Sequence, residues 1–365
     1  MSKERIKSIA VLTGGGDCPG LNAVIRAVTK TAINKYGLEV WGVEDGYLGL
    51  IEDRMHVLSY NEVSNILTVG GTILGSCNRA NPSKYPVKSG KNVRKRDLSN
   101  NCIKALKRHG IDALICVGGD GTMASAARFA KKGVTVMGIP KTIDNDLWGT
   151  EITFGFNTAV TTATEAIDKI HTTASSHHRV MIIEVMGRYT GWIALYAGIA
   201  AGSDLILIPE IPYNLDKVAA YVEKRSQRGR RFSIITVAEG ARPKGGKMVI
   251  AKKLVNSPDP IRLGGVGNVL AEQISQVTGL ECRAVNLGHV QRGGTPTPFD
   301  RALATGFGYK AIELLMSGVK NHLVVQKDGE LSSIPLSRVA GKIKTVPKNH
   351  HLIKAAKAVN TSFGV

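Results

Sequence analysis

A group of acidic and basic side chains at the end of one apolar segment could transfer a phosphoryl group. The sequence IPKTIDNDLWGT (139–150) places Asp144 and Asp146 beside Lys141 and Thr142. Phosphoryl transfer to an alcohol needs a carboxylate that accepts the hydroxyl proton and cations that offset charge on the moving group. Asp144 and Lys141 could supply both. A solvated acidic turn would explain the aspartates but not the lysine and threonine beside them.

Two glycine-rich loops upstream could bind a phosphate donor. TGGGDCPGLNAVIR (13–26) and VGGDGTMASAARFA (117–130) each follow an apolar run and open a helical pattern. Backbone N–H groups at a helix N-terminus bind polyanions, although a mere tight turn would give the first pattern equally well. The second loop contains Asp120. An acid among phosphate-binding amides is best explained as a Mg2+ contact, with an Asx-turn as the alternative.

The composition is that of an ordinary globular protein. The 365 residues are 43% hydrophobic and 21% charged, and this length favours two domains over one. The first residues are charged, and no apolar run approaches the roughly 18 residues of a membrane span, so neither a secretion signal nor a span is expected. The 5 cysteines are scattered without CxxC spacing. We therefore expect no disulfide framework and no zinc site, and a cytoplasmic location.

The formal net charge of +19 predicts attraction to polyanions, whether phosphorylated metabolites or nucleic acid. The densest basic runs are KSGKNVRKR (88–96) and RSQRGRR (225–231). Neither is interleaved with aromatic residues, which make up only 5% of the chain and so offer few stacking platforms. Solvated loops are therefore favoured over a nucleic-acid-binding surface.

Short β-rich runs alternate with glycine-rich turns and helical stretches, which predicts an α/β fold with mostly parallel sheets. We expect strands at 8–13, 38–43, 112–117, 134–139, 180–185, 205–208, 233–237 and 283–287. Ligands bind beyond the carboxyl ends of the strands in such sheets. The segments 80–96 and 240–263 lack periodicity and contain prolines, and we predict that both are long surface loops.

Five motifs together resemble the phosphofructokinase family. They are, in chain order, GGDGT, PKTIDND, SSHHRV, EVMGRYTGWIA and GHVQRGGTPTPFDR. The resemblance extends from about residue 6 to about residue 319. NAD kinases and lipid kinases share GGDGT but have no reason to carry PKTIDND and GHVQRGG. A binding-only relative would lack Asp120, Asp144 or Arg188, and all three are present.

The resemblance implies two Rossmann-like lobes, each a mostly parallel sheet covered by helices on both faces. Residues 1–155 plus about 291–341 would form the lobe that binds nucleotide and Mg2+, and about 156–290 plus the tail 342–365 would bind the sugar phosphate. The resemblance also implies a cytoplasmic kinase of glycolysis. It would transfer the γ-phosphoryl of ATP to the 1-hydroxyl of fructose 6-phosphate, with Mg2+ as cofactor. The implied assembly is a homo-oligomer, dimer or tetramer, with shared active sites and neither a membrane nor a specific nucleic acid as partner.

Site roles also follow from the resemblance. The catalytic residues would be Asp144 as general base, Arg188 at the moving phosphoryl group, Lys141 and Thr142. The ATP-binding residues would be Gly15, Gly16, Arg79, Gly119, Asp120, Gly121 and Thr122, with Asp120 contacting Mg2+. The substrate-binding residues would be Thr142, Ile143, Asp144, Arg179, Met186, Gly187, Arg188, Glu239, Arg283, His289 and Arg292.

Some of these assignments carry qualifications, and the resemblance bears on one further segment. In the family, the residues matching Arg179 and Arg283 reach the 6-phosphate from a neighbouring subunit. Arg79 is displaced by one residue from the position of the family's donor-contacting arginine. The basic run 225–231 lies where related bacterial enzymes bind phosphorylated effectors between subunits, so an anion site is an alternative there.

Two residues bear on the choice of phosphoryl donor. Gly121 leaves room for the α-phosphate of a nucleotide, whereas a second aspartate at this position would crowd and repel it. Lys141 is typical of family members that use pyrophosphate. The pair resembles a mixed-substrate subgroup that is mainly ATP-dependent. We expect ATP as the donor, with pyrophosphate as the alternative. A nucleotide can bind beside the extra Lys141, but it could not bind without the space that Gly121 leaves.

Overall fold

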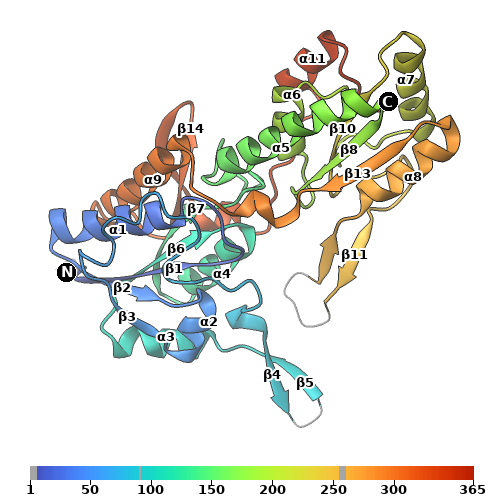
Figure 1. The fold of residues 1–365 in the computed structure, drawn as a ribbon. Coiled ribbons are helices and arrows are strands. Elements are labelled where there is room, and N and C mark those ends of the chain that lie inside the picture. Colours follow the sequence, from blue (N-terminus) through green and yellow to red (C-terminus); the bar gives the residue numbers. More distant parts are fainter. Residues whose placement is uncertain (1–5, 90–91, 255–259) are drawn as a thin grey trace.

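The computed structural model describes residues 6–89, 92–254 and 260–365. Its larger sheet has seven strands in the order β15-β14-β7-β6-β1-β2-β3 (Figure 1). They are β1 (Ser8–Thr13), β2 (Glu39–Val43), β3 (Met55–Val57), β6 (Ala113–Gly118), β7 (Thr135–Pro140), β14 (His322–Lys327) and β15 (Glu330–Pro335). Neighbouring strands are parallel except at the edges, where β3 and β15 run antiparallel.

The smaller sheet has four strands in the order β13-β8-β10-β9, and all of its pairs are parallel. Its strands are β8 (Val180–Val185), β9 (Leu205–Leu207), β10 (Ser233–Ala238) and β13 (Cys282–Asn286). The eight strands expected from the sequence are all present, and their ends differ from the expected ones by at most one residue. The lobe boundaries stay a prediction.

Helices cover both faces of each sheet. They are α1 (Leu21–Tyr36), α2 (Tyr47–Glu52), α3 (Ser99–Arg108), α4 (Asp120–Lys131), α5 (Phe156–His177), α6 (Trp192–Ala200), α7 (Leu215–Gln227), α8 (Val266–Thr278), α9 (Pro298–Met316), α10 (Leu336–Val339) and α11 (His351–Ala358). Two 3-10 turns are η1 (Pro82–Lys84) and η2 (Gly288–Arg292). Among the described residues, no helix has both the length and the hydrophobicity that a membrane span requires.

One hydrophobic core joins the two sheets. Successive side chains of a strand point to opposite faces, so Ile9 and Val11 of β1 pack under α1 and α9, whereas Ala10 and Leu12 pack on the α2, α3 and α4 side. The first of these cores continues without a break to Ile183 of β8 and to the buried faces of α5 and α6. A separate core lies between the smaller sheet and the α7 and α8 side. The shared core fixes how the sheets face each other.

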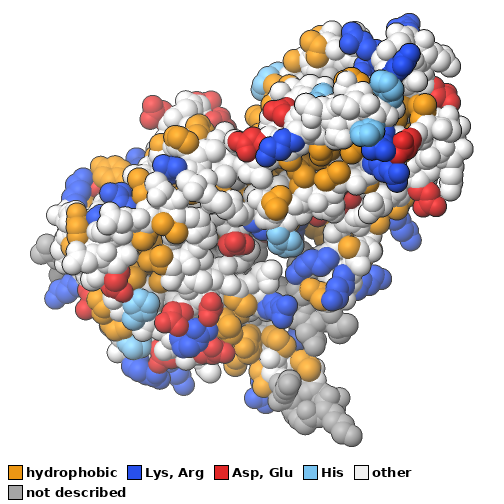
Figure 2. Space-filling model, in the orientation of Figure 1, with side chains coloured by type: hydrophobic (Ala, Val, Ile, Leu, Met, Phe, Trp, Pro, Cys, Tyr) orange, Lys and Arg blue, Asp and Glu red, His pale blue; other side chains and the backbone are white. Residues whose placement is uncertain are grey.

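The prediction of two long surface loops is wrong, because each segment contains an antiparallel hairpin. The strands β4 (Tyr85–Ser89) and β5 (Asn92–Arg96) pair in the first, and β11 (Ile250–Lys253) and β12 (Ile261–Leu263) pair in the second. Residues 90–91 and 255–259 of the predicted loops lie outside the described residues. Both hairpins project from the body (Figure 1), and lysines and arginines gather over β11 (Figure 2). Strands with no buried face need no apolar alternation, so the sequence lacks the usual strand signal.

Candidate active site

The two glycine-rich loops and the aspartate-rich loop meet at one edge of the larger sheet. The strands β1, β6 and β7 are adjacent, with Thr13 in register with Val117 and Gly118 in register with Pro140. The Gly14 N–H donates to the Val117 carbonyl at 2.8 Å. The three loops leave the carboxyl ends of neighbouring parallel strands, where ligands bind in such sheets.

Close packing around Thr122 explains two of the glycines. A Cβ atom on Gly118 would lie 2.3 Å from the Thr122 hydroxyl oxygen, and one on Gly14 would lie 2.6 Å from the same atom. Thr122 is buried in the first turn of α4, which begins at Asp120. The first N–H groups of a helix have no partner within it. The first turn of α4 therefore presents amide donors to the region where the loops meet, as an anion site requires.

Lys141 connects the first glycine-rich loop to the aspartate-rich loop. Its side chain is buried, and its ammonium group donates to the Gly16 carbonyl. Burial lowers the pKa of Lys141. Arg79 lies at the edge of this region, because Cys77 pairs with Gly14 in an isolated bridge and Arg79 is exposed two residues further on.

Asp144 and Asp146 are buried side by side in the aspartate-rich loop. Each is 3% exposed. Among the described residues, the Oδ1 atom of Asp144 has no hydrogen-bond partner, and such a buried oxygen is costly unless a ligand satisfies it. Burial, and then the nearby charge of Asp144, raise the pKa of Asp146. Ile143 is fully buried in the core, which leaves only its main chain for the predicted contact with the sugar.

Four further predicted residues follow the carboxyl ends of strands in the smaller sheet. Met186, Gly187 and Arg188 follow β8, and Glu239 follows β10. The Arg188 N–H donates to Oε1 of Glu239 at 2.8 Å. Buried Gln291, which the sequence analysis missed, accepts a hydrogen bond from the Met186 N–H at 3.3 Å and so holds η2 against this loop.

Two contacts join the facing edges of the two sheets. The Arg188 guanidinium lies 3.4 Å from Oδ1 of Asp120, the first residue of α4. The Arg292 guanidinium donates to the Asp17 carbonyl of the first glycine-rich loop at 3.2 Å. His289 is exposed one turn from Arg292 in η2. The predicted catalytic and donor-binding residues of both sheets therefore surround one region.

Comparisons with known proteins identify the family. The chain matches the family model described as phosphofructokinase over residues 8–315. It belongs to the phosphofructokinase family. It is 52% identical over 361 residues to ATP-dependent 6-phosphofructokinase 2 of Clostridium perfringens, with 98% of each chain covered. It is 48% identical over 340 residues to the pyrophosphate–fructose 6-phosphate 1-phosphotransferase of Amycolatopsis mediterranei, with 93% of this chain and 96% of the relative covered.

Solved phosphofructokinase structures share the fold. The Pichia pastoris phosphofructokinase in the T-state superposes with a TM-score of 0.77 at 33% identity, over 93% of this chain. This chain spans only 36% of that longer protein. Phosphofructokinase from Saccharomyces cerevisiae superposes with a TM-score of 0.79 at 32% identity, over 91% of this chain and 45% of that chain.

Two predicted phosphate-binding residues lie at the opposite end of the smaller sheet. Arg179 precedes β8, and Arg283 is the second residue of β13. Both face Glu281: the Arg179 Nε atom lies 2.9 Å from Oε1 in an ion pair without hydrogen-bond geometry, and the Arg283 guanidinium donates to the same oxygen at 2.9 Å. A strand of this length separates its ends by roughly 20 Å. Within a single chain, Arg179 and Arg283 therefore do not lie close to Arg292.

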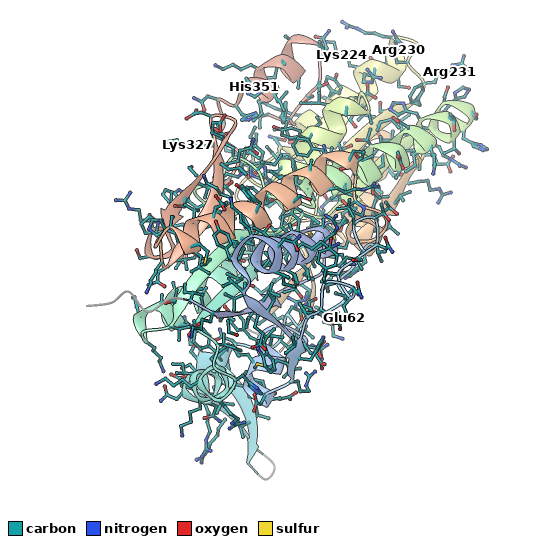
Figure 3. All side chains as sticks on the ribbon, turned by 90° about the vertical axis from the view of Figure 1, so that its left-hand side faces the viewer. Glu62, Lys224, Arg230, Arg231, Lys327 and His351 are labelled. Carbon is teal, nitrogen blue, oxygen red and sulfur yellow. The ribbon has the colours of Figure 1, made fainter. Side chains whose placement is uncertain are left out.

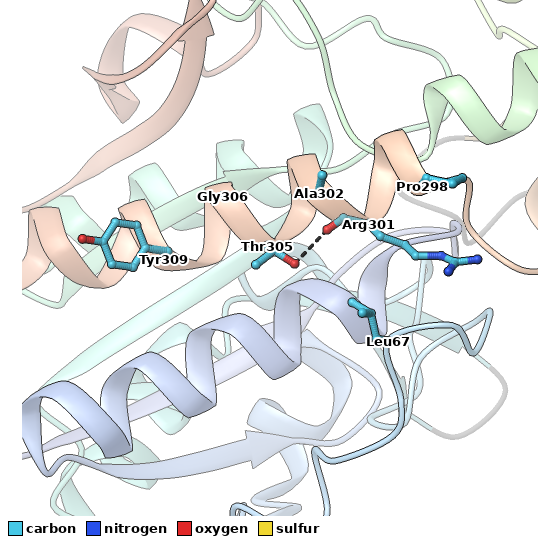
Figure 4. A pocket seen from close by; sticks show the side chains of 7 residues that line it. All are labelled: Leu67, Pro298, Arg301, Ala302, Thr305, Gly306 and Tyr309. Carbon is cyan, nitrogen blue, oxygen red and sulfur yellow. Dashed lines mark hydrogen bonds between the residues drawn. The ribbon is translucent and has the colours of Figure 1, made fainter.

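Other basic and hollow surfaces lie away from the predicted site. Arg225 pairs with Asp204 at 2.6 Å, while Lys224, Arg230 and Arg231 are exposed at one end of the molecule (Figure 3). A shallow hollow on the outer side of α9 contains no predicted site residue (Figure 4). Its lining is Leu67, Pro298, Arg301, Ala302, Thr305, Gly306 and Tyr309.

The buried carboxyl group of Glu239 predicts a pH-dependent stability difference. Burial, and then the charge of Asp144, raise the pKa of Glu239 to about 7. As the pH rises from about 4.5 to about 7, the unfolded chain loses this proton while the folded chain keeps it, so the carboxylate destabilises the fold increasingly. Gln cannot ionise, yet its amide oxygen can still accept the Arg188 N–H. The unfolding free energy of Glu239→Gln minus that of the parent should therefore increase by about 2 to 3 kcal/mol from about pH 5 to about pH 8.

Urea denaturation at both pH values and at one protein concentration measures this gain. The matched control is Glu272→Gln, which replaces an exposed glutamate of α8. A stability difference between parent and Glu239→Gln that stays constant with pH contradicts the raised pKa.

Proposed function

We propose that this chain is an ATP-dependent 6-phosphofructokinase that transfers the γ-phosphoryl of ATP to the 1-hydroxyl of fructose 6-phosphate. One observation carries the proposal: Asp144, with a buried oxygen that has no partner among the described residues, lies where the donor loops and Arg188 of a phosphofructokinase-family chain meet. The names of its relatives from Clostridium perfringens and Spirochaeta thermophila, both ATP-dependent 6-phosphofructokinases, support the same activity.

The donor is assigned to the edge of the larger sheet. The amides of the first turn of α4, together with Gly15 and Gly16, bind the phosphates. Among the described residues, no three His, Cys, Asp or Glu side chains lie close enough to hold a metal by themselves. Magnesium is commonly bound by one or two carboxylates plus substrate phosphates. The partly exposed carboxylate of Asp120 fits such a site and would hold the ion, which would supply positive charge that offsets the charge of the donor.

The acceptor is assigned to the region between Asp144 and the smaller sheet. Asp144 accepts the proton of the sugar hydroxyl while that oxygen bonds to the γ-phosphorus and the bond from phosphorus to ADP breaks. The guanidinium of Arg188 and the ammonium of Lys141 offset the charge on the moving phosphoryl group. Met186, Gly187 and Glu239 contact the sugar, and His289 and Arg292 bind its 6-phosphate.

Space beside Gly121 favours ATP as the donor. Gly121 is exposed in the first turn of α4, and a Cβ atom added to it would meet no atom within 4 Å. The α-phosphate of a nucleotide has room there. Lys141 is engaged with Gly16 inside the protein, so it joins the loops whichever donor is bound. Pyrophosphate remains the second candidate, because the relative from Amycolatopsis mediterranei at 48% identity is named for it.

The positions of Arg179 and Arg283 support a homo-oligomer with shared active sites. Both side chains lie at the end of the smaller sheet opposite Arg188. A second copy that presented this end to the first would complete the 6-phosphate site. The enzyme we propose is cytoplasmic and glycolytic, with the two lobes divided as the resemblance implies.

Replacing the proposed base should slow turnover without weakening sugar binding. Asp144→Asn keeps the size of the side chain but cannot take the proton, so we expect kcat to fall by at least about 100-fold. The KM for fructose 6-phosphate should stay within about 3-fold, because a base lowers the barrier more than it strengthens ground-state binding. Steady-state kinetics of the purified variant measures both. Asp168→Asn, an exposed change on α5, is the control, and near-parental kcat in Asp144→Asn would remove Asp144 from its role.

Shared sites predict that two impaired variants restore each other. Arg283→Ala alone should raise the KM for fructose 6-phosphate far more than the KM for ATP, because its proposed partner is the 6-phosphate. In a mixed oligomer, some sites combine the intact Asp144 of an Arg283→Ala chain with the intact Arg283 of an Asp144→Asn chain. Such a site has both residues. We expect an equal mixture, refolded together, to regain roughly a quarter of the parental sites.

The two variants refolded separately and then combined serve as the control for that mixture. Mixed oligomers can be verified by differently tagged chains. Mixed oligomers that form and yet show no more activity than the separate variants would contradict sharing.

Donor comparison tests the proposed activity itself. The parent, with fructose 6-phosphate and Mg2+, should turn over ATP and prefer it to pyrophosphate. Gly121→Asp places a carboxylate in the open space next to Asp120, where it crowds and repels the α-phosphate. We expect a fall in kcat/KM for ATP of at least about 100-fold, equivalent to about 2.7 kcal/mol.

Gly121→Ala is the matched control, since its methyl group fits the open space and adds no charge. The acidic variant should fold normally, because an acid is favourable in the first turn of a helix. Equal use of ATP by Gly121→Asp and parent would refute the assignment of the α-phosphate, and a parent that prefers pyrophosphate would refute ATP as donor.

A further inference from the structure

A half-buried lysine near the carboxyl end of the chain holds the loop between β7 and α5. Lys344 belongs to an extended segment between α10 and α11, residues 342–346, which we name the C-terminal strap. Its ammonium group donates to Oδ1 of Asn145 at 3.0 Å, to the Thr150 carbonyl at 3.0 Å and to the Glu151 carbonyl at 2.8 Å. An ammonium has three N–H donors. All three are directed at this one loop.

The main chain of the strap also pairs with the loop. The Lys344 N–H donates to the Asp146 carbonyl at 2.7 Å, and Ile343 forms an antiparallel bridge with Leu147. Burial lowers the pKa of Lys344 to about 7. Keeping an ammonium group in this place costs free energy, which the three acceptors offset.

The other side of the strap binds the start of α6. The indole N–H of Trp192 donates to the Lys344 carbonyl at 3.0 Å. The Val346 N–H donates at 2.9 Å to Oε1 of Glu210, and the same oxygen accepts the Gly191 N–H at 3.2 Å. Gly191 and Trp192 come directly after the loop that carries Arg188. The strap therefore connects the aspartate-rich loop of one sheet to the arginine-bearing loop of the other.

The turn held by Lys344 is the one that orients Asp144. Asn145 has a left-handed backbone with φ of 50° and stands between the two buried aspartates. Its Oδ1 atom accepts the Thr153 N–H at 3.1 Å as well as the Lys344 ammonium. Asparagine adopts a left-handed backbone more readily than most residues because its side chain can form local hydrogen bonds, and here Thr153 and Lys344 hold that side chain. Loss of Lys344 would free the turn to relax and would move the Asp144 carboxylate.

We infer that Lys344 is a positioning residue for phosphoryl transfer, which fixes the Asp144 loop relative to Arg188 without touching either substrate. The inference rests on the proposed function. Catalytic groups must be held to within about 0.5 Å of their productive places, and a displacement of about 1 Å can cost 100-fold in rate. The effect should therefore appear in kcat and not in substrate binding.

The experiment compares Lys344→Met with the parent in the full chain. We expect kcat to fall by about 10- to 100-fold while KM for ATP and for fructose 6-phosphate stays within about 3-fold. Lys342→Met is the matched control: it lies two residues away in the same strap, and its exposed ammonium sits 4.3 Å from the centre of the Trp148 ring. It should keep the parental kcat. An unchanged kcat in Lys344→Met overturns the inference.

A double variant separates positioning from general damage. Once Asp144→Asn has removed the base, there is no proton acceptor to misplace, so adding Lys344→Met should lower kcat by less than about 3-fold. An equal loss in both backgrounds would mean that Lys344 supports the fold and not the placement of Asp144, and would overturn the inference. Should Lys344→Met fail to fold, Lys344→Gln, which retains N–H donors, takes its place in both backgrounds with the same two criteria.

Amide hydrogen exchange gives a readout that needs no activity. We expect residues 142–153 to exchange faster in Lys344→Met than in the parent, with the strands of the larger sheet unchanged. A parent that transfers phosphoryl from neither ATP nor pyrophosphate would refute the proposed function, whereas unchanged exchange in this loop would refute the role of Lys344. The two failures are therefore distinguishable.

Discussion

The constraint on which this molecule depends is the concentration of carboxyl groups between two sheets. Burial, and then the nearby charges of Asp144 and Asp120, raise the pKa of Asp146, and burial, and then the charge of Asp144, raise the pKa of Glu239. Like charges at short range in a low dielectric repel strongly unless cations or protons offset them. The fold supplies both remedies: the guanidinium of Arg188 lies against Asp120, and burial favours the protonated forms of Asp146 and Glu239.

The parallel sheets make this concentration possible. In a parallel sheet, the loops that follow neighbouring strands lie at the same edge. Three loops of the larger sheet and three segments after strands of the smaller sheet therefore reach one region. The shared core beneath α1, α5, α6 and α9 fixes the orientation of the two edges. The C-terminal strap then adds a direct connection between the loops themselves. The buried core therefore sets the orientation of the two sheet edges, and the polar contacts of the strap then hold the site loops in place.

The sequence was sufficient for the strands and for the loops that follow them. β1 and β8 have the predicted ends, because both are mostly apolar runs that directly follow a basic residue, Lys7 or Arg179, and lead into a glycine-containing loop. The hairpins of β4–β5 and β11–β12 were missed, since exposed strands carry no apolar alternation. Lys344 was also missed. Its acceptors are an amide and two main-chain carbonyls that lie 193 to 199 positions away in the sequence, and no local pattern encodes such a contact.

Arg179 and Arg283 show a different limit. The resemblance assigned Arg179, Arg283 and Arg292 to one 6-phosphate, although the strands expected at 180–185 and 283–287 begin at or next to the first two arginines. The register of β8 and β13 puts these two at the amino ends, beside Glu281. Only the resemblance to the family predicted that they belong to a neighbouring copy, and the fold of one chain leaves them available for that role.

The site also contains local structure that is unfavourable by itself. In the part of the chain that the structure describes, Asp144 keeps a buried oxygen without a partner, and Arg188, like Asn145, has a left-handed backbone with φ near 50°. Each of these features costs free energy in the free protein. The remaining structure tolerates the cost because the cores on either side are continuous and closely packed. A sugar hydroxyl bound to Asp144 would satisfy the orphan oxygen, so part of the cost is recovered when substrate binds. Strain held in this way keeps the base ready to accept a proton, and it accounts for the number of contacts that the fold directs at a single loop.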